Sequence, residues 1–226
     1  MRTRPLAVLG LAALLLTACG GSDGNGESAK KGPQVAADAA DALQKAGAVH
    51  LTGNGKQDGK PVTADVRLQG SDATGTIDEG GDRLKIVATG GKVYVQASSG
   101  FWSQSGVPAS VAGALAGKWV IVPSEAAGQV LPFSLKSLTE DLRHPSGAAI
   151  KDAVHTSTLH GKKVVVVTQT DGSTLDVAAT GTPYPLRTVD KGSDAGTFDA
   201  SDFGKKVTIT APSGALDLSQ LMTGGA

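Results

Sequence analysis

The chain has 226 residues, with 21 basic and 21 acidic side chains, so its formal charge at pH 7 is +0. The lack of a basic excess argues against a nucleic-acid-binding protein. A single cysteine excludes an internal disulfide and a thiolate metal site, while the length is sufficient for a substantial hydrophobic core.

The first 19 residues form a targeting motif. Two arginines precede an apolar run, Pro5–Leu16, that is shorter than the ~20 helical residues needed to cross a bilayer. The following Leu16-Thr17-Ala18-Cys19 resembles the lipobox of bacterial lipoproteins. The resemblance implies that residues 1–18 are a signal peptide and that Cys19 carries a diacylglycerol on its sulfur. The alternative is a secretory signal with a chance cysteine, which would leave a reactive free thiol.

A lipidated Cys19 implies a protein anchored on the extracytoplasmic face of the cell membrane, because several acyl chains hold a protein stably at a bilayer. Residues 19–32 are rich in glycine and polar side chains and contain no apolar side chain larger than alanine after Cys19. This composition predicts a flexible tether. The apolar positions of residues 33–46 then recur at helical spacing and end at Gly47, which predicts a helix.

From Val49 the apolar residues alternate with polar ones, which is typical of strands with one buried face. The turns between them are short and contain glycine, so the strands form an antiparallel meander. The five predicted strands cover residues 49–52, 63–69, 73–78, 84–89 and 92–96.

A helical middle section follows, with helices predicted at residues 108–116, from Glu125 with Ser124 as its cap, and from Ser134 or Ser137 to Arg143. A short strand at residues 118–122 separates the first two. A second strand block is predicted at residues 154–159, 163–170, 175–179, 186–190 and 207–210. The fold class is therefore α+β, a large curved antiparallel sheet or half-barrel with helices on its concave side, and residues 33–226 are expected to form a single domain.

No catalytic or metal site is predicted from the residue spacing. His155 and His160 are five residues apart near a strand end, an odd spacing that places them on opposite faces. Residues 20–24 match a nucleophile-elbow pattern, but they lack the strand and helix that this motif requires. We therefore expect a non-enzymatic protein with no cofactor and no metal.

Two stretches carry a second resemblance. Gly91-Lys92-Val93-Tyr94-Val95 with Phe101-Trp102, and Gly117-Lys118-Trp119-Val120 with Pro123, are similar in spacing to actinobacterial lipoproteins of the LppX/LprG type. The order of elements over residues 33–210 is also similar to that of the LolA/LolB lipoprotein carriers. The resemblance implies a half-barrel closed by helices over a hydrophobic cavity that holds lipid acyl chains.

On this interpretation the protein is a monomeric lipid carrier or chaperone of the cell envelope, whose partners are the membrane and a lipid or glycolipid. The alternative is an envelope interaction or sensing lipoprotein with the same fold and a filled core. The predicted cavity wall consists of alternating apolar strand residues, with Trp119 near the mouth. These residues are Val66, Leu68, Leu84, Ile86, Val93, Val95, Val164 and Val166.

Overall fold

The computed structural model describes residues 24–57, 59–131, 134–192 and 195–223. The predicted signal peptide, residues 1–18, and Cys19 lie outside these ranges. Among the helices of the described part of the chain, none combines the length and hydropathy needed to span a bilayer.

Helices occur at the start, in the middle and at the end of the described chain. They are the 3-10 helix η1 (Glu27–Ala29), α1 (Gly32–Ala46), α2 (Ser99–Gln104), α3 (Ala109–Leu115), α4 (Ser124–Val130), α5 (Leu135–Arg143) and α6 (Leu218–Thr223). The first strand block comprises β1 (Ala48–Gln57), β2 (Lys60–Gln69), β3 (Asp72–Glu79), β4 (Asp82–Thr89), β5 (Lys92–Gln96) and β6 (Trp119–Val122). The second block comprises β7 (Ile150–Leu159), β8 (Lys162–Gln169), β9 (Thr174–Ala178), β10 (Pro185–Asp190), β11 (Gly196–Ser201) and β12 (Leu216–Asp217).

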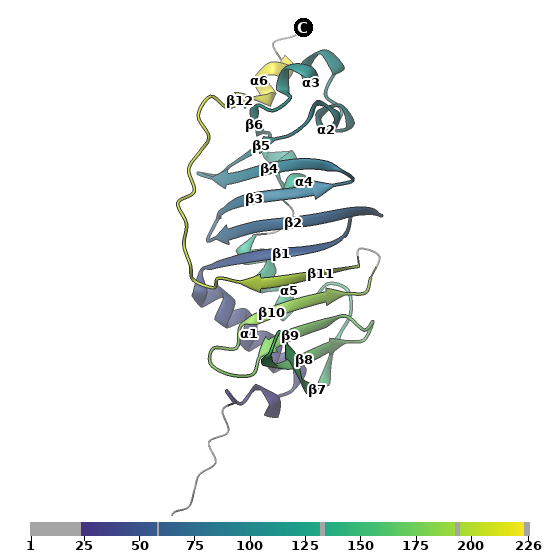
Figure 1. The fold of residues 1–226 in the computed structure, drawn as a ribbon, viewed down its shortest axis with the longest axis vertical. Coiled ribbons are helices and arrows are strands. Elements are labelled where there is room, and N and C mark those ends of the chain that lie inside the picture. Colours follow the sequence, from purple (N-terminus) through teal and green to yellow (C-terminus); the bar gives the residue numbers. More distant parts are fainter. Residues whose placement is uncertain (1–23, 58, 132–133, 193–194, 224–226) are drawn as a thin grey trace, which may run out of the picture.

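The twelve strands of the described residues form one open sheet in the order β12-β6-β5-β4-β3-β2-β1-β11-β10-β9-β8-β7 (Figure 1). Every neighbouring pair is antiparallel except β12 and β6, which are parallel. The predicted α+β fold with a large curved sheet is confirmed, and the predicted five-strand meander corresponds to β1–β5. The two strand blocks join where β1 pairs with β11.

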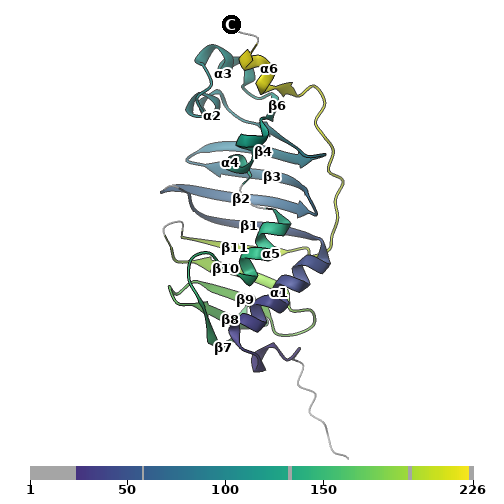
Figure 2. The ribbon, with the colours of Figure 1, turned by 180° about the vertical axis from the view of Figure 1, so that it is seen from behind.

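One face of the sheet, here the helix face, is covered by α1, α4 and α5 (Figure 2). Helix α1 can approach the sheet closely because its first residue is Gly32. A β-carbon at this position would overlap the Lys151 carbonyl oxygen of β7. Arg143 at the end of α5 donates to Asp41 and, at 3.0 Å, to Gln44 Oε1 of α1, which ties the two helices together.

Apolar residues on the helix face form two clusters. The larger one lies between β1–β6 and the helices α2, α3 and α5, and it includes Trp102, whose exposed fraction is 2%. The smaller one places Val35 and Ala39 of α1 against Val165 and Val177. Leu142 of α5 packs against both clusters, so the helix pair bridges the two halves of the sheet.

Residues 207–210, predicted as a strand, have no regular structure. They belong to residues 202–215, here the strap, which runs along the strand ends from β11 to β12 (Figure 1). Gln69 Oε1 accepts from the Val207 backbone N–H at 2.9 Å. The last long strand of the second block is instead β11, which pairs with β1 and β10. It was not predicted because Phe198 is its only large apolar residue.

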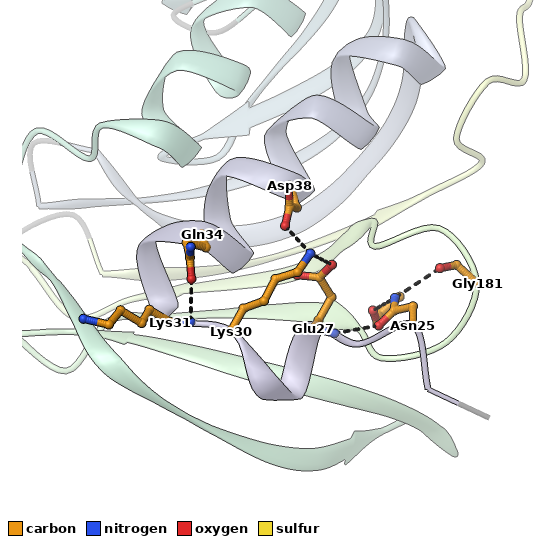
Figure 3. Close-up of polar contacts among 8 residues, drawn as sticks. Asn25, Glu27, Lys30, Lys31, Gln34, Asp38 and Gly181 are labelled. Carbon is orange, nitrogen blue, oxygen red and sulfur yellow. Dashed lines mark hydrogen bonds and ion pairs between the residues drawn. The ribbon is translucent and has the colours of Figure 1, made fainter. Parts of the chain in front are cut away.

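The C-terminal part of the predicted tether, residues 24–31, also differs from the prediction. Residues 24–31, here the N-terminal segment, pack beneath α1 rather than hanging free (Figure 3). Lys30 Nζ donates to Glu27 Oε1 at 2.9 Å and to Asp38 Oδ2 at 2.6 Å. Glu27 is only 2% exposed, so an ion pair with a buried carboxylate holds a segment whose composition suggested disorder.

Candidate functional site

A cavity of about 570 Å³ lies between the helix face of the sheet and the helix pair α1 and α5. Its floor comes from β1, β2 and β8–β11, and residues 145–147 lie at its rim. Large apolar side chains from strands and helices form much of its lining. They include Leu43, Val49, Leu51, Leu138, Leu142 and Phe198.

Small side chains from both apolar clusters line part of the cavity. They include Ala36 of α1 and Ala64 and Ala200 of the sheet. Thr188 of β10 also lines it and is exposed, although it pairs with Leu175 and Phe198 on the helix face. The space over Thr188 is therefore open to solvent.

Phe198 is positioned by the glycine on the strand beside it. Gly53 of β1 pairs with Phe198, and a β-carbon at Gly53 would overlap the Thr197 carbonyl oxygen and lie 2.6 Å from Phe198 Cδ1. A β-carbon at Gly196 would be 3.3 Å from Phe198 Cε2. The ring thus occupies space that only glycine leaves free, a known use of glycine in strands.

The rim of the cavity is polar and is held by side-chain hydrogen bonds. Asp171 accepts from the Ser173 N–H at 2.9 Å and from Ser173 Oγ at 3.0 Å. The backbone hydrogen bond from Ser173 is the main cause that lowers the pKa of Asp171. Ser173 Oγ accepts from the Lys191 N–H at 3.0 Å, which joins the β8–β9 turn to the loop after β10.

None of the nine predicted wall residues lines this cavity. Five of them are buried in the larger cluster, namely Val66, Leu68, Leu84, Ile86 and Val95. Val93 packs against the same cluster. Val164 and Val166 alternate with Val165 and Val167, which lie beneath α1, so they point to the opposite face of β8. Trp119 is half-buried on β6, distant from the cavity in the strand order.

None of the residues that line the cavity was predicted as a wall residue. The signal available was the spacing of Leu138 and Leu142 on α5, which gives that helix an apolar face. The small residues on the facing strands gave no comparable signal.

The opposite face of the sheet, here the open face, carries charged pairs between strands. His50 Nε2 lies 2.6 Å from Asp65 Oδ1, and Arg187 donates to both carboxylate oxygens of Asp199 at 2.6 and 2.9 Å. The hydrogen bonds from Arg187 lower the pKa of Asp199. Within the described ranges, no three His, Cys, Asp or Glu side chains gather closely enough to hold a metal ion. Charged side-chain pairs on the open face therefore help to hold neighbouring strands together.

Asp202, directly after β11, makes the folding stability of the protein depend on pH. Hydrogen bonds from Lys205 and Arg67 lower its pKa from 3.8 to about 2. Because the folded-state pKa is depressed, the stabilisation is present above pH ~4 and is lost as the pH falls towards 2. In urea unfolding between pH 2 and 5, we expect Asp202→Asn to be less stable than the wild type at pH 5 and to converge with it at pH 2. Asparagine tolerates the positive φ of 52° at this position, so a constant difference would contradict the assignment.

Solved structures share this architecture. LprF from Mycobacterium bovis matches with a TM-score of 0.55 and 14% identity, over 82% of this chain and 100% of that one. The lipoprotein LppX from Mycobacterium tuberculosis matches with a TM-score of 0.52 and 17% identity, over 79% of this chain and 99% of that one. A scan against protein-family models finds no match, and neither does a search of curated proteins. The predicted resemblance to LppX-type proteins is therefore confirmed for the fold.

Proposed function

We propose that this protein is a lipid-anchored, non-enzymatic lipid-binding protein that holds acyl chains in the cavity between the sheet and the helices α1 and α5. The observation that carries the proposal is the 570 Å³ space lined by apolar side chains and open to solvent at a polar rim. Its volume lies within the range of about 300–1,000 Å³ that is usual for ligand pockets. The fold shared with LprF and the lipoprotein LppX supports the proposal.

The binding energy would come from removing acyl chains from water. Each buried CH₂ group contributes about 0.8 kcal/mol, so even part of one long chain gives a substantial affinity. Leu43, Leu138 and Leu142 would contact the chain from the helix side, and Val49 and Phe198 from the sheet side. The rim hydroxyl groups and carboxylates would lie near the lipid headgroup.

The lipidated Cys19 would hold the protein on the extracytoplasmic face of the cell membrane. This part of the proposal rests on the lipobox at residues 16–19. A carrier role in the cell envelope requires in addition that the lipid exchanges, because a carrier must bind its ligand reversibly in the apolar cavity.

Filling the cavity tests the proposal. Thr188→Trp places an indole in the open part of the cavity, and we expect lipid extracted from the purified protein to fall at least ~10-fold, because the indole replaces several buried CH₂ groups. Thr76→Trp is the matched control, since Thr76 pairs with Asp65 and Lys85 on the open face. Equal lipid contents in the two folded variants would contradict the proposed site.

A further inference from the structure

The N-terminal segment joins the body at one particular end of the strands. The Asn25 backbone N–H donates to the Ala179 carbonyl at 2.9 Å, and Asn25 Nδ2 donates to the carbonyls of Ala178 at 2.8 Å and Gly181 at 3.1 Å (Figure 3). Ala179 in turn donates its N–H to the Lys163 carbonyl at 3.0 Å. The chain therefore enters the body where β8 begins and β9 ends.

The sequence sets a short distance between this point and the lipid anchor. Cys19 precedes Asn25 by six residues, and a fully extended chain spans at most about 3.6 Å per residue, or about 22 Å. The Asn25 end of the body must therefore stay within about 22 Å of an acylated Cys19.

The same end of the strands is basic. Four exposed lysines surround the Asn25 attachment point and the start of the strap, and we call them the basic end: Lys162, Lys163, Lys205 and Lys206. Asp202 accepts from Lys205 at 2.7 Å and from Arg67 at 2.9 Å, so its charge is already balanced. Among the described residues, no ion pair involves Lys162, Lys163 or Lys206.

An aromatic pair lies among these lysines. The rings of Tyr184 and Phe203 stack at 4.1 Å with an interplanar angle of 1°, and both line a hollow that Lys162, Lys163 and Lys205 also line. Half-buried aromatic rings next to lysines are typical of surfaces that contact the headgroup region of a bilayer.

The cavity opens at the other end of the strands. Its exposed lining residues include Ser146, Gly147, Asp171 and Asp190, which lie before β7, between β8 and β9, and at the end of β10. Since β8 starts at the basic end and finishes at Gln169, its length separates Lys162 from this rim. Asp141 adds a third carboxylate to the lining, and Lys151 interacts electrostatically with Asp171.

We propose that the basic end docks on an anionic bilayer, and that the cavity therefore opens away from the membrane that holds the anchor. The inference rests on the proposed lipidation of Cys19. Each lysine near an anionic surface contributes about a fivefold increase in binding, so three unpaired lysines orient the body strongly. The acyl chains of a ligand would then exchange at the end of the protein distal to its own bilayer.

Site-directed fluorescence quenching tests this orientation in the lipidated full-length protein. Cys19 is the only cysteine, and its sulfur would be acylated, so a single introduced cysteine can be labelled alone. Thr180→Cys places a label at the basic end, and Ser146→Cys places one at the cavity rim. The proteins are reconstituted in phosphatidylglycerol vesicles that carry a nitroxide on a fraction of the headgroups.

We expect quenching at residue 180 to exceed that at residue 146 by at least ~3-fold, and Lys162→Gln/Lys163→Gln/Lys206→Gln to remove the difference. Equal quenching at both labels in the wild type, or stronger quenching at residue 146, would overturn the orientation alone. Failure of the protein to float with the vesicles would overturn the proposed anchor and the docking together.

Discussion

Lys30→Met is expected to release the N-terminal segment from the body. The Glu27 side chain is 3% exposed, and its Oε1 accepts from Lys30 Nζ at 2.9 Å, while Oε2 has no hydrogen-bond partner among the described residues (Figure 3). The Lys30 side chain is 39% exposed, but its removal leaves the Glu27 carboxylate buried and unpaired, which is costly. Glu27 can avoid this cost by leaving its site with residues 24–31. Hydrogen exchange should therefore show that amide protection in this segment is lost.

Two variants separate the ion pair from other effects of the substitution. Lys31→Met removes the neighbouring cation, whose 2.9 Å bridge to Asp152 joins two exposed side chains, and it should leave the protection of residues 24–31 unchanged. Adding Glu27→Gln to Lys30→Met removes the buried negative charge and should restore part of the protection. Full protection in Lys30→Met alone would show that the pair does not hold the segment.

Gly53→Ala is expected to lower the free energy of unfolding by about 3 kcal/mol. Its β-carbon would overlap the Thr197 carbonyl and lie 2.7 Å from Phe198 Cα, and neither backbone atom can move without separating β1 from β11. Overpacking of this kind typically costs 1–3 kcal/mol and sometimes more. Because this strand pair joins the two halves of the sheet, the loss should appear in the global unfolding transition measured in urea.

Gly113→Ala provides the matched control. Gly113 lies within α3, and a β-carbon there would meet no atom of the described residues within 4 Å. Alanine is favoured over glycine in helices by roughly 0.5–1 kcal/mol, so this variant should gain stability while Gly53→Ala loses it. Equal effects of the two substitutions would contradict the close packing assigned to Gly53.

The first strand block was predictable because each of its strands has one apolar and one polar face. The alternation of Val66 and Leu68 with Arg67, for example, fixes both the strand and the face that is buried. Helix α5 was predictable for a different reason. Ser134 accepts from the Ser137 N–H as an N-cap, and the helix ends at Arg143, just before His144-Pro145, as its sequence indicates.

The cavity was not predictable, because it depends on residues that are far apart in the sequence. Val164–Val167 are apolar at every position, so alternation cannot tell which two of them face α1. Ala64 and Ala200 are consistent with a fully packed core as well as with a core that contains a cavity. Only the packing of α1 and α5 across the sheet shows that the space between the two clusters stays open.

The structure of the N-terminal segment was also not predictable from the sequence. Its composition is that of a tether, yet Asn25 and Glu27 fix it through contacts with residues 178–181 and with Lys30. Such pairing of a buried charge cannot be inferred from composition, because it depends on where α1 lies. Residues 20–23 remain as the proposed tether, outside the described ranges.

Native mass spectrometry of the mature chain with Cys19→Ser, purified without detergent, tests the central claim most directly. The substitution removes the chain's own anchor, so any lipid detected would be a ligand. The cavity predicts a bound species at about one lipid per chain, which Thr188→Trp removes. A lipid-free mass that stays unchanged after incubation with bacterial membrane lipids would contradict a lipid-binding role. It would leave an interaction or sensing protein that uses the same fold.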